Sequence, residues 1–238
     1  MHIIPVFSTL ITLIFTIAVF NRYQARGGAH LLIWGIGLVF YGLGTVMEIV
    51  LGLTFNALAL KLWYLSGAML TAAWLGQGTV NLLWRKHHFA QVTNIILTLV
   101  SLAALGLILV APVQSAAGFH PNIPVSTQYK DILTRSGLTI TLTILLNTYG
   151  TFTLIGGALY SAFLFWRKKV LFNRMLGNIL IAGGAMLPAL GGSLLKAGFP
   201  DWLYLSEFSG VILMYAGFIL ATATQPVHVP SSPLAGTD

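Results

Sequence analysis

The chain has 238 residues, of which 57% are hydrophobic and only 7% are charged, and its net charge is +7. Soluble domains carry about 25% charged residues, so this chain lacks the charge to cover a water-facing surface. The basic residues stand in short clusters between apolar runs, which is typical of membrane topology signals and argues against a nucleic-acid partner. The sequence contains no cysteine, which excludes disulfides, thiol catalysis and thiolate metal sites.

Seven stretches have the roughly 20 mostly apolar residues that a membrane-spanning helix needs. They predict an all-α bundle of seven transmembrane helices over residues 1–225, surrounded by the lipid bilayer. The fifth stretch is longer than a bilayer requires, so it should tilt or protrude. The expected helices cover residues 3–20, 31–53, 61–84, 90–111, 137–166, 174–196 and 202–224.

The basic residues predict the orientation of the bundle, because cytoplasmic loops are enriched in Lys and Arg. Eight of them flank the helices on one side and four on the other, which places the N-terminus outside and the C-terminus inside a prokaryotic cytoplasmic membrane. The group of eight is Arg22, Arg26, Arg85, Lys86, Arg167, Lys168, Lys169 and Arg174, and the group of four is Lys61, Lys130, Arg135 and Lys196. The first helix lacks a basic leader and a cleavage pattern, so we expect it to be retained.

Two segments between and beyond the helices are expected to be irregular. Residues 111–137 form one long outer loop rich in Pro, Ser and Thr, and residues 226–238 form a cytoplasmic tail with three prolines and no apolar periodicity, which predicts disorder. No kinase or cyclase follows the helices, so any signal should leave through a membrane or cytoplasmic signalling partner.

Five ionisable residues gather near the outer ends of the helices. Lys61, Lys196 and Asp201 can reach water at the membrane surface. Glu48 and Glu207 have shorter side chains and lie deeper. A charge in hydrocarbon costs at least about 2.5–3.5 kcal/mol at the bilayer centre. These two carboxyl groups must therefore be paired, be neutral or face a wet cavity, and the sequence leaves a structural and a ligand-binding role both open.

Polar and aromatic residues recur at helical spacing around these charges and should face the bundle interior. The candidate ligand-binding residues are Glu48, Lys61, Trp63, Tyr64, Lys196, Trp202, Tyr204 and Glu207. A second set should form the floor of the same pocket or bond across helices: Tyr41, Gln77, Asn81, Asn147 and Thr151. The alternatives are an aromatic belt at the membrane surface for the first set and helix packing for the second.

The sixth helix is unusually rich in glycine. Gly183, Gly184, Gly191 and Gly192 surround Pro188, which frees a backbone carbonyl and can kink the helix. Two interpretations remain open, a seam of close helix packing and a hinge in the outer half of the helix.

Several chemistries lack the residues they need. The last helix has no lysine for a retinal Schiff base, the histidines do not converge on a metal site, and no phosphate-binding loop or nucleophile elbow is present. We therefore predict no catalytic residue, metal or cofactor, and nothing in the sequence argues for an enzyme.

The second and third helices resemble a known family. The runs HLLIWGIGLVFYGLGTVMEIV (30–50) and ALKLWYLSGAMLTAAWLGQG (59–78) are similar to the seven-helix membrane sensor regions of bacterial histidine kinases, through the Trp and Glu of helix two and the Lys-Leu-Trp-Tyr that opens helix three. The resemblance implies a bundle that senses something at the outer face or in the membrane. Residues 226–238, which follow helix seven, do not resemble the kinase of that family, so we expect no direct signalling output from them.

Three functions follow as alternatives. We expect a sensor or binding protein for a small or lipidic ligand in an outward-facing pocket. A small-solute transporter is the second, since LWYLSG (62–67) and WLYLSEFSG (202–210) suggest a repeat of three helices on each side of a linker helix. The third is a non-catalytic membrane scaffold in which the two glutamates are paired.

Overall fold

The computed structural model describes residues 3–84, 88–114, 118–121, 123–168, 171–199 and 201–223, without the side chains of Ser193, Leu195, Lys196 and Asp201. The predicted tail at 226–238 and the basic residues Arg85, Lys86 and Lys169 lie outside these residues. The described part of the chain is almost entirely helical, with one isolated β-bridge between Val113 and Leu133. The all-α fold is therefore confirmed.

Seven helical segments in the described residues are long and apolar enough to cross a membrane, which makes the chain a multi-pass membrane protein. Five spans are single helices and two are composite. The single helices are α1 (Ile4–Arg26), α2 (Ala29–Leu53), α5 (Phe89–Val110), α9 (Phe172–Lys196) and α10 (Asp201–Thr222). The third span joins α3 (Ala57–Trp63), η1 (Tyr64–Leu70) and α4 (Thr71–Leu83), and the fifth joins α7 (Gly137–Thr151), η3 (Phe152–Gly156) and α8 (Gly157–Arg167).

Two features differ from the expected elements. Helix α1 continues to Arg26 rather than ending at residue 20, because the polar residues after the apolar run remain helical until Gly27, whose φ of 66° ends the helix. The long loop contains a helix of its own, α6 (Val125–Ile132). Its apolar residues Val125 and Ile132 are buried against the bundle.

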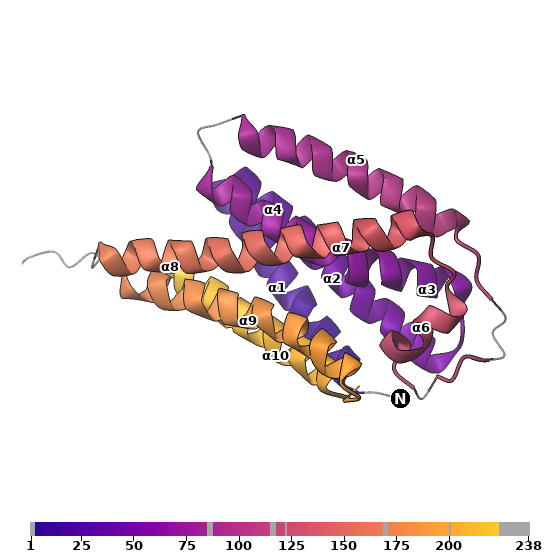
Figure 1. Cartoon of the computed structure of the whole chain (residues 1–238). Coiled ribbons are helices and arrows are strands. Elements are labelled where there is room, and N and C mark those ends of the chain that lie inside the picture. The colour runs from indigo at the N-terminus through magenta and orange to yellow at the C-terminus, as the bar shows by residue number, and fades with distance from the viewer. Residues whose placement is uncertain are drawn as a thin grey trace, which may run out of the picture.

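Six spans close into a ring, and the seventh lies outside it. Around the ring, α1 packs on α2 and α10, α10 on α9, α9 on the η3–α8 segment, and the fifth span on the third span, which returns to α2. Helix α5 lies at the outer edge and contacts only one side of the ring, while α6 and the N-terminal end of α1 lie at the same end of the bundle (Figure 1). The ring is what encloses the site described below.

The two composite spans each contain a π-helical segment, η1 and η3. A π-helix bonds to the fifth residue rather than the fourth, which widens the turn and leaves carbonyl groups for other donors. In η1, the Ser66 carbonyl accepts the Thr71 hydroxyl at 2.8 Å, and the Ala68 carbonyl accepts the Asn147 amide of α7 at 2.6 Å. The irregular backbone is therefore satisfied inside the bundle, as a membrane interior requires.

The outward faces are apolar and the interior holds two packed clusters. Large hydrophobic side chains such as Leu13 and Ile17 of α1 and Ile95 and Leu99 of α5 are exposed, as expected of residues that face lipid. One buried cluster joins the third span with α5, α6 and α7, and the other joins α1, α2, α9 and α10. The cavity described next lies between residues of both clusters.

Candidate functional site

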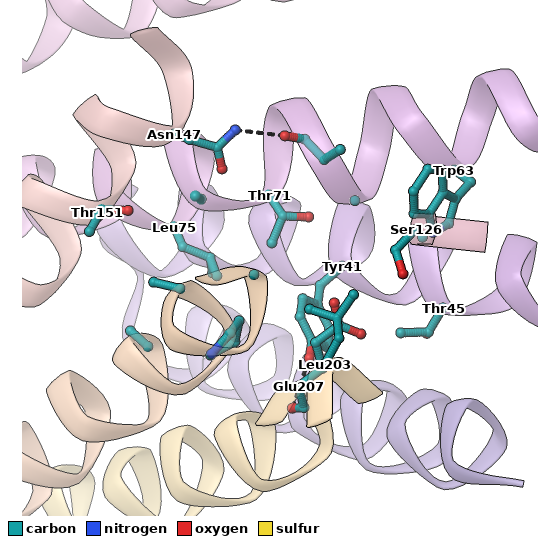
Figure 2. Close-up of a pocket in the computed structure, with 18 of the residues that line it drawn as sticks. Tyr41, Thr45, Trp63, Thr71, Leu75, Ser126, Asn147, Thr151, Leu203 and Glu207 are labelled. Atoms are coloured by element: carbon teal, nitrogen blue, oxygen red, sulfur yellow. Dashed lines mark hydrogen bonds between the residues drawn. The ribbon is translucent and has the colours of Figure 1, made fainter. Parts of the chain in front are cut away.

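A cavity of about 320 Å³ lies inside the ring of helices. Its walls come from α2, the third and fifth spans, α9 and α10, and α6 adds Ser126 and Tyr129. Figure 2 shows Trp63 and Ser126 on one side of this space, Tyr41, Leu203 and Glu207 on another, and Asn147 with its hydrogen bond farther along. A volume of this size falls in the range of small-molecule sites.

Both glutamates predicted at the outer ends of the helices line this cavity. Glu48 of α2 is only 6% exposed, and its Oε1 accepts a hydrogen bond from the indole Nε1 of Trp63 at 3.1 Å. Its second carboxyl oxygen, Oε2, is buried without a partner among the described residues. One buried acceptor of Glu48 is therefore unsatisfied within the described part of the chain.

Glu207 of α10 also lines the cavity and is half-buried. Its backbone carbonyl accepts the Tyr41 hydroxyl at 2.9 Å, which ties α10 to α2 across one side of the cavity. Its carboxyl group forms no hydrogen bond or ion pair with any other described residue. The two walls thus each present a carboxyl group that the described residues do not neutralise.

Of the two lysines expected to pair with these carboxyl groups, Lys61 is described and does not lie beside them. Lys61 donates its ammonium to the carbonyl of Leu109 at 2.7 Å, near the C-terminal end of α5, where a cation is favourable. It does not line the cavity. The side chain of Lys196 lies outside the described residues, so only its place at the end of α9 is known.

The four predicted aromatic residues lie at different distances from the cavity. Trp63 lines the cavity. Tyr64 is buried behind it, with its hydroxyl 3.0 Å from the Thr143 hydroxyl, and Tyr204 is buried beside a small adjoining hollow that Glu48 also lines. Trp202 is 53% exposed and does not line the cavity, which fits the membrane-surface belt better than a wall of the site.

The predicted polar floor divides in the same way. Tyr41, Asn147 and Thr151 line the cavity. Gln77 and Asn81 instead face α5, where they bond to Thr93 and Asn94, so they belong to a packing contact. The widened turn of η1 explains the split, because the regular helical phase that links Trp63 to Gln77 is lost across it and Thr71 and Leu75 face the cavity instead.

Helix α6 supplies site residues that the sequence interpretation missed. Ser126 is 6% exposed and lines the cavity, and its hydroxyl oxygen is buried without a partner among the described residues. The spacing of Val125, Tyr129 and Ile132 is that of one helical face, and Pro124 stands where a helix begins. That pattern could have revealed α6 within the Pro- and Ser-rich segment.

An aromatic layer with an arginine lies beneath α6. The Tyr129 ring is 5.3 Å from the Trp63 ring and 5.5 Å from the Tyr64 ring, measured between centroids. The Arg135 guanidinium lies 4.9 Å from the Tyr129 centroid, a cation–π distance. Burial raises the pKa of Tyr129 against the opposing effect of Arg135, so this phenol stays neutral at physiological pH.

The inner end of the cavity is apolar. Leu75, Leu154 and Met214 line both the cavity and a small adjoining hollow, which Phe15, Trp34, Leu38 and Ile181 also line. Apart from the indole of Trp34, whose Nε1 is buried without a partner among the described residues, hydrocarbon and thioether side chains line this inner end.

Comparison of this chain with models of known protein families, with curated proteins and with solved structures gives no match.

Proposed function

We propose that this protein binds a small molecule in the cavity beneath α6 and acts as a membrane sensor or receptor-like protein. The observation that carries the proposal is the pair of buried polar atoms on the cavity wall, Glu48 Oε2 and Ser126 Oγ, that have no partner among the described residues. Buried polar groups are almost always hydrogen-bonded, and an orphan calls for an explanation. A ligand in the cavity would provide the missing partners.

The apolar inner end favours binding over transport. A transporter would need a polar path through the bundle in at least one state, whereas Leu75, Leu154 and Met214 fill this position with apolar side chains. Gln77 and Asn81, the polar residues expected on such a path, are engaged with α5.

The carboxyl groups of Glu48 and Glu207, which no described residue neutralises, also argue against a purely structural role. A scaffold that kept two glutamates in a bundle would be expected to pair them with bases or donors, because an isolated buried charge is costly. In the described residues, Glu48 has one donor and the Glu207 carboxyl has none.

The proposed placement follows the charge distribution and the resemblance. With the N-terminus outside, α6 and the end of the cavity that it lines face the exterior of a prokaryotic cytoplasmic membrane. The similarity of residues 30–50 and 59–78 to histidine-kinase sensor regions supports a sensory role. The occupied state would then be read by a membrane or cytoplasmic signalling partner.

Co-purification tests the proposal. The protein would be purified in detergent, extracted and analysed by mass spectrometry beside the double variant Glu48→Gln/Glu207→Gln and the control Asp131→Asn, which removes an exposed carboxyl group of α6 that does not line the cavity. We expect a defined molecule in the wild type and the control that is lost from the double variant. If no molecule distinguishes the three proteins and all are equally stable, the binding function is wrong.

A further inference from the structure

We propose that the ligand of this cavity is a small organic cation, an ammonium compound with an apolar body. This inference rests on the proposed binding function and adds the chemical class of the ligand. Its basis is the sign of the charge on the cavity walls: two carboxyl groups face the space, and none of the described residues that line it is basic.

The basic groups near this end of the bundle are engaged elsewhere or stand apart. Lys61 is held at the Leu109 carbonyl, and Arg135 lies against the rings of Tyr64 and Tyr129 without lining the cavity. Lys130 is exposed on α6. The side chain of Lys196 lies outside the described residues, so the test below includes this lysine.

The carboxyl groups leave capacity that a cation can use. Glu48 has one oxygen bonded to Trp63 and one without a partner in the described chain. Glu207 is half-buried, and among the described residues it is bonded only through its backbone. Burying a carboxylate is unfavourable unless a donor or an opposite charge compensates it. A protonated amine between the two walls supplies both charge and hydrogen-bond donors, and a quaternary ammonium group supplies charge alone. A neutral molecule of the same shape supplies no charge.

The remaining walls suit the carbon part of such a ligand. The aromatic side chains of Tyr41, Trp63 and Tyr129 line the cavity, and ring faces attract ammonium groups within about 6 Å by about 0.5–2 kcal/mol. Leu203 and Met214 add apolar surface. The volume of about 320 Å³ is far larger than a single bare ion needs, which favours an organic cation.

Two matched pairs of probes test the charge of the ligand. Choline is compared with its uncharged analogue 3,3-dimethylbutan-1-ol, and benzylammonium with benzyl alcohol. Binding to the full chain in detergent would be measured by calorimetry at constant ionic strength. We expect at least one cation to bind at least about tenfold more tightly than its neutral partner, a difference of about 1.4 kcal/mol.

Isosteric variants locate the effect. Glu207→Gln and Glu48→Gln should each weaken binding of that cation by about tenfold and leave the neutral analogue unchanged within about twofold. Asp131→Asn is the matched control and should bind as the wild type does. Lys196→Gln should bind the cation at least as tightly as the wild type, since it only removes positive charge. In Glu48→Gln, the amide oxygen can still accept the hydrogen bond from Trp63. If Glu48→Gln is nevertheless unstable, Glu207→Gln provides an independent test.

The outcomes separate the two proposals. The proposal of a cationic ligand is overturned if the cation and its neutral analogue bind equally, or if neither Gln substitution weakens binding of the cation. Binding in the cavity would still stand in both cases. Failure of all four probes also overturns the cationic ligand, and the co-purified molecule then decides the binding function by itself. Tighter binding of the cation that depends on Glu48 and Glu207 supports both.

Discussion

Glu48 is a carboxyl group in a membrane-spanning helix with a single hydrogen-bond donor among the described residues, the Trp63 indole at 3.1 Å. Loss of that donor would leave both carboxyl oxygens without a protein partner in the described chain. Leaving a buried polar group unsatisfied costs about 1–3 kcal/mol, more than an average hydrogen bond contributes.

Trp63→Phe should therefore lower the free energy of unfolding by about 1–3 kcal/mol, seen as a lower Tm in detergent. The control is Trp202→Phe, which changes an exposed indole on α10 and should leave Tm unchanged. The double variant Glu48→Met/Trp63→Phe separates the hydrogen bond from packing. The free-energy costs of the single variants Glu48→Met and Trp63→Phe are compared with the cost of the double variant. If the two costs simply add, the hydrogen bond between Glu48 and Trp63 contributes nothing to stability and this explanation fails.

Gln77 is fully buried, and its amide links three elements. Its Nε2 donates to Asn94 Oδ1 at 2.6 Å and to Thr93 Oγ1 at 2.9 Å on α5, and its Oε1 accepts the Tyr149 hydroxyl of α7. In lipid such bonds hold helices together because apolar surface alone gives no drive for association.

Replacing this amide should affect stability and not the site. Gln77→Met should lower Tm, corresponding to about 1–3 kcal/mol, because Asn94 and Tyr149 lose a partner, and binding of the cationic probe should be unchanged. Gln91→Met, on the exposed face of α5, is the matched control and should alter neither. Loss of probe binding in Gln77→Met at full stability would instead place this residue in the site.

The four glycines that flank Pro188 in α9 stand in two adjacent pairs, and the members of each pair have different surroundings. A methyl group on Gly184 would meet the Gly210 carbonyl oxygen at 2.6 Å, and one on Gly191 would meet the Ser206 hydroxyl of α10. Gly183 and Gly192 have open space, and Gly192 lines the cavity. Gly184 and Gly191 thus belong to a packing seam with α10, which supports the first of the two interpretations of this helix.

Gly184→Ala should separate α9 from α10 and destabilise the protein by about 1–3 kcal/mol, the usual cost of overpacking. The neighbouring change Gly183→Ala meets no atom and should be neutral or stabilising by up to about 1 kcal/mol, since alanine is the better helix former. The Tm of each variant in detergent checks this pair. Equal Tm shifts for the two variants would mean that the close contact between Gly184 and α10 does not determine the stability of the protein.

On the scale of the whole molecule, the basic residues divide between the two ends of the bundle. Arg22, near the C-terminal end of α1, donates to the Thr222 carbonyl near the end of α10, so these ends meet. Arg135 and Lys61 lie at the opposite end, near α6. This division is the physical basis of the predicted orientation, because positive residues are retained in the cytoplasm.

The cysteine-free sequence allows that orientation to be measured directly. Thr134→Cys, on the exposed segment after α6, should react with a membrane-impermeant maleimide in intact cells. His88→Cys, exposed at the start of the α5 span, should react only after permeabilisation. The reverse pattern would invert the topology and place α6, with the end of the cavity that it lines, on the cytoplasmic side.

By itself, the sequence determined the seven spans and the all-α fold, because about 20 apolar residues in lipid must form a helix that satisfies its own backbone. It also pointed to Glu48 and Glu207 as residues in need of a partner or a cavity. Only the tertiary structure decided which helical faces meet. Periodicity in the sequence tells which residues share one side of a helix, but only if the number of residues per turn is constant. The π-helical turn of η1 broke that assumption, separating Trp63 from Gln77, while the fold of the loop brought Ser126 and Tyr129 of α6 over the cavity.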